Sequence, residues 1–164
     1  MSAIIPILIG SQSDMPHAQA IAGVLDQLDI AYEIRIGSAH KTPAHVLALL
    51  AQYEADPRPK VYITIAGRSN ALSGFVDAQV TAPVIACPPP SDAFGGADLF
   101  SSLRMPSSVA PALVLEPVNA ALLAAKILGL SDPAIQARAA ALQQRSVDAV
   151  LSADRALVEE RGEA

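Results

Sequence analysis

The fold is decided by residues 3–14, which read AIIPILIGSQSD. Ala3–Ile9 is a continuous apolar run that ends at Gly10, and such runs bounded by turn residues are typical of a strand buried on both faces. The polar turn is followed by Met15–Leu28, whose apolar residues recur at helical spacing. The stretch therefore predicts a buried strand, a polar turn and an amphipathic helix in direct succession.

The same succession is repeated along the chain. Ala31–Ile36 predicts a second strand and Pro43–Tyr53 a second helix, and three further strands are predicted at Lys60–Ala66, Pro83–Ala86 and Ala112–Leu115. Strands that alternate with helices imply right-handed crossovers and a mostly parallel sheet covered on both faces. We therefore expect an α/β fold with a three-layer, doubly wound sheet of flavodoxin-like or Rossmann-like type, which binds ligands at the carboxyl ends of its strands.

The C-terminal part of the chain is predicted to be helical. Asn119–Leu128 is rich in Ala and Leu, and Pro133 starts an extended helix that runs to about Val158 with an Ala-rich apolar side. No internal repeat is visible. We expect residues 1–164 to form one domain, with helix 133–158 packing on a neighbouring subunit.

Composition narrows the class of protein. The 164 residues are 52% hydrophobic and 16% charged, which suits one domain with a sizeable core. A net charge of −5, the absence of Trp and an aromatic content of 4% argue against nucleic-acid binding. The one cysteine excludes an intrachain disulfide, the N-terminus lacks a basic leader, and no apolar stretch approaches the roughly 20 residues of a membrane span. We therefore expect a cytoplasmic protein with no membrane span.

Polar loops follow the first three long strands, at Gly10–Asp14, Gly37–Thr42 and Ala66–Asn70, and should converge. In the first loop Gly10 permits close approach of the backbone, and the next helix presents free N–H groups to a phosphate. The hydroxyls of Ser11 and Ser13 could also bind the phosphate, and Asp14 could accept hydrogen bonds from ribose hydroxyls. The alternative is that Ser13 or Asp14 only caps the helix.

The second loop offers acid–base chemistry. Histidine is the side chain that most readily exchanges a proton near neutral pH, so His40 beside the fixed charge of Lys41 could handle a proton next to an anion. His17 and His45 lie within predicted helices, where a surface or capping role is expected.

The third loop can be functional or structural. Gly67 allows a tight turn, Arg68 can pair with carboxylates within or between subunits, and Ser69 and Asn70 can cap the next helix. Cys87 has no metal-ligand spacing around it and is interpreted as structural. The chain contains no Walker loop, dinucleotide fingerprint, nucleophile elbow or paired-Cys motif, so neither a cofactor nor a metal is expected.

Taken in order, five motifs resemble the aminoimidazole ribonucleotide (AIR) carboxylase and mutase family over nearly Ile4–Leu128. They are GSQSD at 10–14, SAHKTP at 38–43, AGRSN at 66–70, CPP at 87–89 and SSLRMP at 101–106. The mutase class usually has His-Leu-Pro-Gly after its third strand, whereas residues 71–74 here read ALSG. The resemblance therefore implies the direct-CO2 class (class II), a lyase that reversibly joins CO2 to AIR without ATP or a cofactor.

The resemblance also implies roles for the loop residues. His40 would move the proton at C4 of the imidazole. The predicted substrate-binding residues are Gly10, Ser11, Ser13 and Asp14 on the ribose and phosphate side, Ser38, Ala39 and Lys41 on the phosphate or carboxylate side, and Gly67, Arg68 and Ser69 near the base and CO2. The family further implies a homo-octamer, and Ser108 stands where relatives often have glycine, which would alter the loop near the site.

Two alternatives stay open. One is the N5-carboxyaminoimidazole ribonucleotide mutase, which would share the fold and the nucleotide site. The other is a noncatalytic nucleotide-binding module, because a fold alone carries no function. The segment 101–107 suits a lid or a subunit contact, and the role of Arg104 is left undecided.

Overall fold

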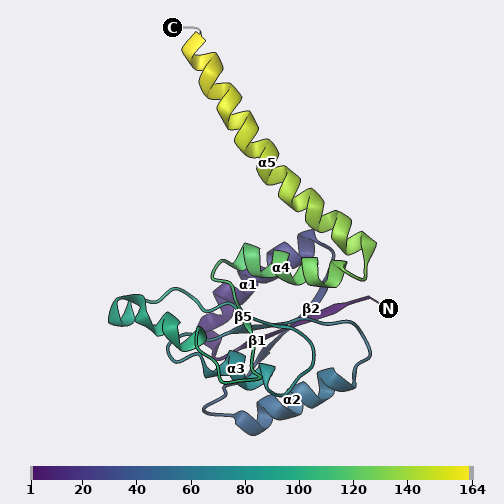
Figure 1. Ribbon diagram of the computed structural model, residues 1–164, viewed down its shortest axis with the longest axis vertical. Helices are drawn as coiled ribbons and strands as arrows, with labels where there is room; N and C mark the ends of the chain where they lie inside the picture. Colours follow the sequence, from purple (N-terminus) through teal and green to yellow (C-terminus); the bar gives the residue numbers. More distant parts are fainter. Residues whose placement is uncertain (1, 163–164) are drawn as a thin grey trace.

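A sheet of five parallel strands forms the middle layer of the molecule (Figure 1), in the order β2-β1-β3-β4-β5. The structure, a computed structural model, describes residues 2–162. The strands are β1 (Ile4–Ile9), β2 (Ala31–Ile36), β3 (Tyr62–Ile65), β4 (Val84–Ala86) and β5 (Ala112–Leu113). The predicted α/β class is confirmed, and the sheet is parallel throughout rather than mostly parallel. The strand order reverses between β1 and β3, which places a ligand-binding crevice at their carboxyl ends.

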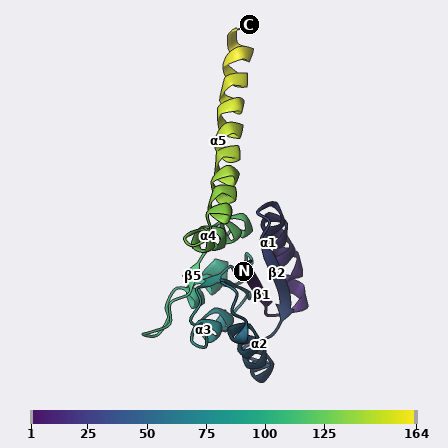
Figure 2. The ribbon, with the colours of Figure 1, turned by 90° about the vertical axis from the view of Figure 1, so that its right-hand side faces the viewer.

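Helices cover both faces of the sheet (Figures 1 and 2). One face carries α1 (Met15–Gln27) and α4 (Pro117–Gly129), and the other carries α2 (Pro43–Ala55) and α3 (Ala71–Asp77). Pro43 and Pro117 lie in the first turn of their helices, where the missing N–H of proline costs no hydrogen bond. Two 3₁₀ segments complete the connections, η1 (Gln12–Asp14) before α1 and η2 (Ala93–Ser102) after β4.

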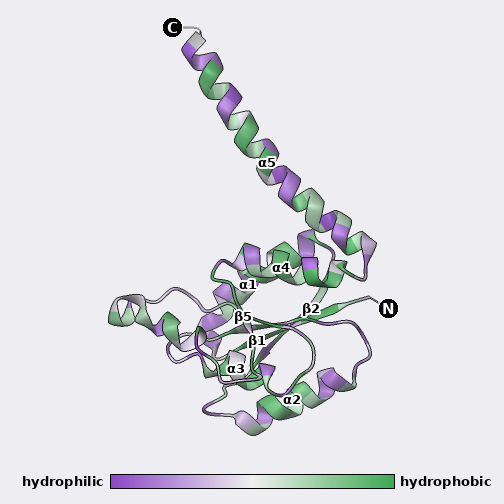
Figure 3. Ribbon diagram, in the orientation of Figure 1, coloured by the Kyte–Doolittle hydropathy of each residue, from purple (hydrophilic) through white to green (hydrophobic). Residues whose placement is uncertain are grey.

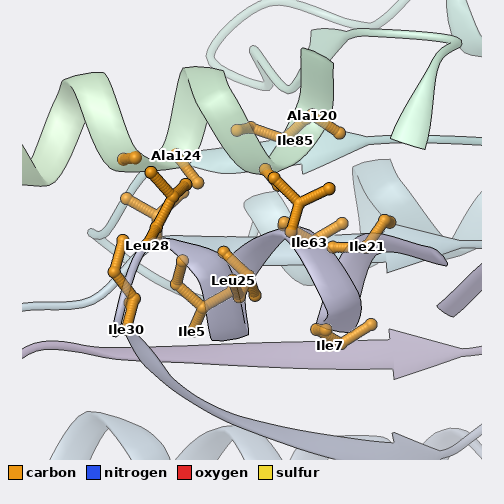
Figure 4. Close-up of a cluster of buried hydrophobic side chains, with 14 of the residues drawn as sticks. Ile5, Ile7, Ile21, Leu25, Leu28, Ile30, Ile63, Ile85, Ala120 and Ala124 are labelled. Atoms are coloured by element: carbon orange, nitrogen blue, oxygen red, sulfur yellow. The ribbon is translucent and has the colours of Figure 1, made fainter. Parts of the chain in front are cut away.

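Strand β1 supplies both halves of the core. Ile5 and Ile7 point into the cluster made with α1 and α4, whereas Ile4 and Leu8 point into the cluster made with α2 and α3. Figure 4 shows the first cluster, in which side chains from β1, α1, β3 and α4 meet. Each fully buried Leu or Ile contributes about 1.5–3 kcal/mol, so a strand buried on both faces anchors the sheet. This explains why its sequence is apolar at every position.

The element ends differ little from the prediction. The predicted strand 60–66 shortens to Tyr62–Ile65, with Lys60 reduced to an isolated bridge to Ile4. The strand predicted at 112–115 pairs with β4 only over Ala112–Leu113, because the chain then turns into α4, which begins at Pro117.

Helix α5 (Pro133–Gly162) leaves the body of the molecule (Figures 1 and 2). Its first turns pack against α4 through Ile135 and Ala139, which are buried. Beyond them the helix is exposed, and Figure 3 shows apolar positions interspersed with polar ones along it. The extended C-terminal helix is thus confirmed, while its packing on another subunit stays a prediction. The single-domain prediction includes residues 1, 163 and 164, which lie outside the described residues.

No helix within residues 2–162 is both long enough and apolar enough to cross a membrane.

Candidate active site

A cavity of about 650 Å³ lies where the loops after β1, β2 and β3 meet. The predicted convergence of the three loops is therefore present. The lining includes every residue of the predicted site: Gly10, Ser11, Ser13, Asp14, Ser38, Ala39, His40, Lys41, Gly67, Arg68 and Ser69. Ala66 and Leu72 also line it and were missed, since a small apolar side chain beside a loop has no distinctive sequence signal. What each side chain does in this cavity stays a prediction.

The first loop is held by its own hydrogen bonds. Ser11 donates through its backbone N–H and its hydroxyl to Oδ2 of Asp14, over 3.0 and 3.1 Å, and its Oγ lies 2.7 Å from Oγ of Ser13. Gly10 is close to the third loop, because a Cβ built on it would lie 3.3 Å from Cβ of Ala66. The alternative that Asp14 caps the first helix with its side chain is wrong: the carboxylate makes no capping hydrogen bond to α1 and instead accepts from Ser11 across the η1 segment. Asp14 also lines the cavity, and both of these hydrogen bonds use Oδ2, so Oδ1 accepts neither of them.

The second loop is a compact turn that presents His40. The backbone N–H of Ser38 donates to Oγ1 of Thr42 over 2.9 Å, and the backbone N–H of Lys41 donates to Oγ of Ser38 over 3.2 Å. His40 is exposed, and no described residue makes a hydrogen bond to its ring. The turn thus fixes the backbone around a histidine whose ring nitrogens both remain available to a ligand.

The third loop bends sharply at Arg68, whose φ is 60°. This is the left-handed region of backbone conformation, which residues other than glycine rarely adopt. Such a conformation costs on the order of 1–3 kcal/mol and persists only where the surroundings enforce it. The structural role foreseen for Asn70 is present: its side chain accepts from the backbone N–H of Ser73 at the start of α3, over 3.4 Å. Arg68 itself is exposed and lines the cavity.

The charged groups favour an anionic ligand. Lys41 and Arg68 line the cavity, and neither makes an ion pair with any residue between positions 2 and 162. Asp14 is the one carboxylate among the lining residues, and two donors of Ser11 already contact it. A phosphate in this cavity would meet two uncompensated cations, several hydroxyls and the start of the α1 segment.

A smaller cavity of about 250 Å³ adjoins the first and shares Ala66, Gly67 and Arg68 with it. Cys87 precedes Pro88 of its lining and is completely buried, and burial raises the pKa of its thiol to about 12. The structural interpretation of Cys87 agrees with this environment. The surface role expected for His17 is wrong: this residue is half-buried and its Nε2 lies 3.4 Å from Sγ of Cys87. His45 is exposed on α2, as expected.

The segment predicted as one polar loop, 101–107, is divided in the structure. Ser101 and Ser102 end the η2 segment, and the loop proper begins after them. Ser108 has φ of 68°, a conformation in which glycine is free of strain. Within the described part of the chain no three His, Cys, Asp or Glu side chains are grouped as a metal site.

A model of the AIR carboxylase family matches residues 4–149. The chain belongs to this family. It is 64% identical over 135 residues to the phosphoribosylaminoimidazole carboxylase of Treponema denticola, covering 82% of this chain and 85% of that protein. It is 50% identical over 151 residues to the enzyme of the same name from Archaeoglobus fulgidus, covering 92% of this chain and 83% of the other.

The fold agrees with these relationships. The crystal structure of Treponema denticola PurE superimposes with a TM-score of 0.92 at 57% identity, covering 93% of this chain and 97% of that one. The match includes the three loops that form the cavity, since the family model spans all of them. The chain is therefore an enzyme of the AIR carboxylase family, which serves purine biosynthesis.

Proposed function

We propose that this enzyme carboxylates AIR directly with CO2, giving 4-carboxy-5-aminoimidazole ribonucleotide without ATP or a cofactor, and that it also catalyses the reverse reaction. The observation that carries the proposal is the meeting of His40, Lys41 and Arg68 in one cavity of about 650 Å³. A cavity of that size suits a small ligand such as a nucleoside monophosphate. The free cation of Lys41 suits the phosphate, that of Arg68 suits the carboxylate formed from CO2, and an available histidine suits a reaction that needs a single proton transfer.

The chemistry needs no other group. The amino-substituted imidazole is an enamine, so its C4 attacks the carbon of CO2, a C–C bond forms, and one C=O electron pair moves to oxygen as the carboxylate. C4 then still carries its proton. His40 removes this proton, and the C–H electron pair restores the aromatic ring. In reverse the protonated His40 returns the proton to C4, and the C–C bond breaks to release CO2.

The other loops hold the substrate for this step. Ser11 and Ser13, which line the cavity just before α1, would bind the phosphate or ribose together with Lys41, which follows His40 directly. The remaining carboxylate oxygen of Asp14 can accept a ribose hydroxyl. Gly67 and Ser69 line the same cavity from the third loop and would contact the base. Most of the rate acceleration would come from holding AIR and CO2 in one reactive geometry, since no covalent intermediate with the enzyme is formed.

Direct carboxylation is preferred to the mutase reaction. Ala71 stands where mutases usually have a histidine, and Ser73 stands where they have proline. The two relatives described above are both named carboxylase. A noncatalytic nucleotide-binding module would have no use for His40, whereas the second loop is arranged to present it.

The test is a comparison of two substrates. Purified enzyme is given AIR with bicarbonate-buffered CO2, or N5-carboxy-AIR, both without ATP, and the product is followed by ultraviolet absorbance. We expect turnover from AIR and CO2, and a loss of at least about 100-fold in kcat for His40→Asn, in line with the usual contribution of a general base. His45→Asn, on the exposed face of α2, is the matched control and should retain wild-type rates. Turnover from N5-carboxy-AIR alone would identify a mutase instead.

We further propose that the enzyme is a homo-octamer in which α5 packs on a neighbouring subunit. Apolar side chains recur along the exposed part of α5 at Val147, Val150, Leu151, Leu157 and Val158, at spacings of three, four and seven. Exposed apolar residues of this density mark an interface. Sedimentation of Leu151→Glu should show a smaller assembly, with Ser152→Glu on the neighbouring position as the control. An unchanged sedimentation coefficient for Leu151→Glu would contradict the role of α5.

A further inference from the structure

A buried polar cluster lies directly behind the third loop of the site and joins it to the η2 segment. Its centre is Asn70, of which 2% is exposed, and its second buried member is Ser102, of which 4% is exposed. The Asn70 side chain donates through Nδ2 to Oγ of Ser102 over 2.8 Å. Its backbone N–H donates to Oγ of Ser101 over 3.0 Å. These contacts connect positions more than thirty residues apart in the chain.

The same side chain also fixes the start of α3. Oδ1 of Asn70 accepts from the backbone N–H of Ser73, so each polar atom of the amide group has a partner. Ser101 extends the cluster toward the loop, since its Oγ lies 2.7 Å from the carbonyl oxygen of Asp98 and 3.5 Å from that of Arg68. The amide of Asn70 therefore holds three segments together: the third loop, helix α3 and the end of η2.

Asn70 and Ser102 line the smaller adjoining cavity and not the substrate cavity, whereas the three residues before Asn70 line the substrate cavity. Among these is Arg68, whose left-handed backbone conformation must be enforced by its surroundings. The hydrogen bonds of Asn70 and Ser101 lie next to this strained residue and hold the backbone on its C-terminal side. Burial makes these hydrogen bonds specific, because a buried amide that lost its partner could not replace it with water.

We propose that Asn70 is a positioning residue for the carboxylation reaction. Through Ser101 and Ser102 it holds Gly67–Ser69 against the cavity, and it thereby sets where the base and CO2 meet His40. This inference rests on the proposed function, because it assigns the third loop to the reacting end of the substrate. None of the hydrogen bonds of the cluster goes to the loops that would bind phosphate and ribose. Loss of Asn70 should therefore lower kcat and leave KM for AIR nearly unchanged.

The experiment compares Asn70→Ala and Ser102→Ala with Ser73→Ala in the full-length enzyme. Ser73 is equally buried, but its hydroxyl has no hydrogen-bond partner among the described residues, so its removal should leave kcat and KM at wild-type values. For Asn70→Ala we expect kcat to fall about 10- to 100-fold, the effect of misplacing reacting groups by about 1 Å, with KM within threefold. Ser102→Ala should also lower kcat with little change in KM, but by a smaller factor. It replaces Asn70→Ala in the test if that variant does not fold. A melting temperature lowered with kcat within twofold of wild type would overturn the proposal.

A second readout is independent of the reaction. Trypsin cleaves after arginine where the backbone can move, and Arg68 is already exposed. We expect native Asn70→Ala or Ser102→Ala to be cut between Arg68 and Ser69 at least tenfold faster than wild type or Ser73→Ala, as measured by mass spectrometry. Equal cleavage would overturn the inference. If the wild type carboxylated no AIR, the proposed function would fail, and the cleavage rates alone would decide whether Asn70 holds the loop.

Discussion

Gly37 directly follows β2 and is the first residue of the loop that carries His40. The residues around Gly37 leave no space for a side chain. A Cβ built on it would lie 2.8 Å from Cγ2 of Val46, a residue of α2 that is completely buried. Val46 cannot yield easily, because a β-branched side chain in a helix has one strongly preferred rotamer. In Gly37→Ala, either α2 or the loop must therefore move.

The expected magnitude follows from this contact. Overpacking a closely packed core typically costs 1–3 kcal/mol, so Gly37→Ala should lower the free energy of unfolding by about that amount. Val46→Ala alone removes two buried methyl groups and should cost about 2–3 kcal/mol, including the cavity it leaves. In the double variant the new methyl group occupies part of that cavity. The combined cost should therefore fall short of the sum by about 1 kcal/mol.

The assay is urea unfolding of the two single variants and the double variant, with the carboxylation rate measured on the same samples. Gly23→Ala is the matched control, because Gly23 lies inside α1 and a Cβ there would meet nothing within 4 Å. That control should stabilise the protein by about 0.5–1 kcal/mol. The Gly37→Ala loop should be displaced enough to lower kcat about 10-fold or more. A stabilised Gly37→Ala, or strictly additive costs in the cycle, would refute the steric argument.

Three further predictions concern groups outside the substrate cavity. Burial lowers the pKa of His17. The stability that His17 contributes is therefore complete above pH 6.5 and declines as the pH falls toward the lowered pKa. Between pH 7 and pH 5 the melting temperature of His17→Gln should fall less than that of the wild type. A thiol with its pKa raised to about 12 is almost wholly protonated, so Cys87 should react with iodoacetamide at pH 8 only after unfolding, and rapid labelling of the native enzyme would show that it is accessible. Ser108→Gly should raise the free energy of unfolding by up to about 1 kcal/mol, because relief of the strained φ exceeds the entropy that glycine adds to the unfolded chain. A free energy of unfolding below that of the wild type would mean that the Ser108 hydroxyl makes an important contact.

The sequence predicts the layers well because each strand carries its own local signal. The uniformly apolar Ala3–Ile9 predicts a central strand, and the alternating Ala31–Ile36 is the partly exposed β2 at the sheet edge. The element ends are harder to predict, since they depend on tertiary pairing. Lys60 has strand-like neighbours on one side, but only a single bridge to Ile4 is formed there.

The cavity is predicted for a topological reason. Parallel strands bring their carboxyl ends to one edge, so the polar loops after β1, β2 and β3 had to meet. The contacts of Asn70 with Ser101 and Ser102 could not be predicted in the same way, because no local pattern connects residues 31 or 32 positions apart. The pairing of His17 with Cys87 joins residues 70 positions apart and gives no signal in either helix or strand periodicity.

The most direct test of the account is the source of the new carboxyl group. The wild-type enzyme is incubated with AIR and ¹³CO2 in the absence of ATP, and the product is examined by ¹³C NMR. Direct carboxylation predicts a labelled carboxyl group on C4 that appears at the rate at which AIR is consumed and exchanges with added unlabelled CO2. An unconsumed AIR pool with no label on C4, beside conversion of N5-carboxy-AIR in a parallel incubation, would contradict the proposal.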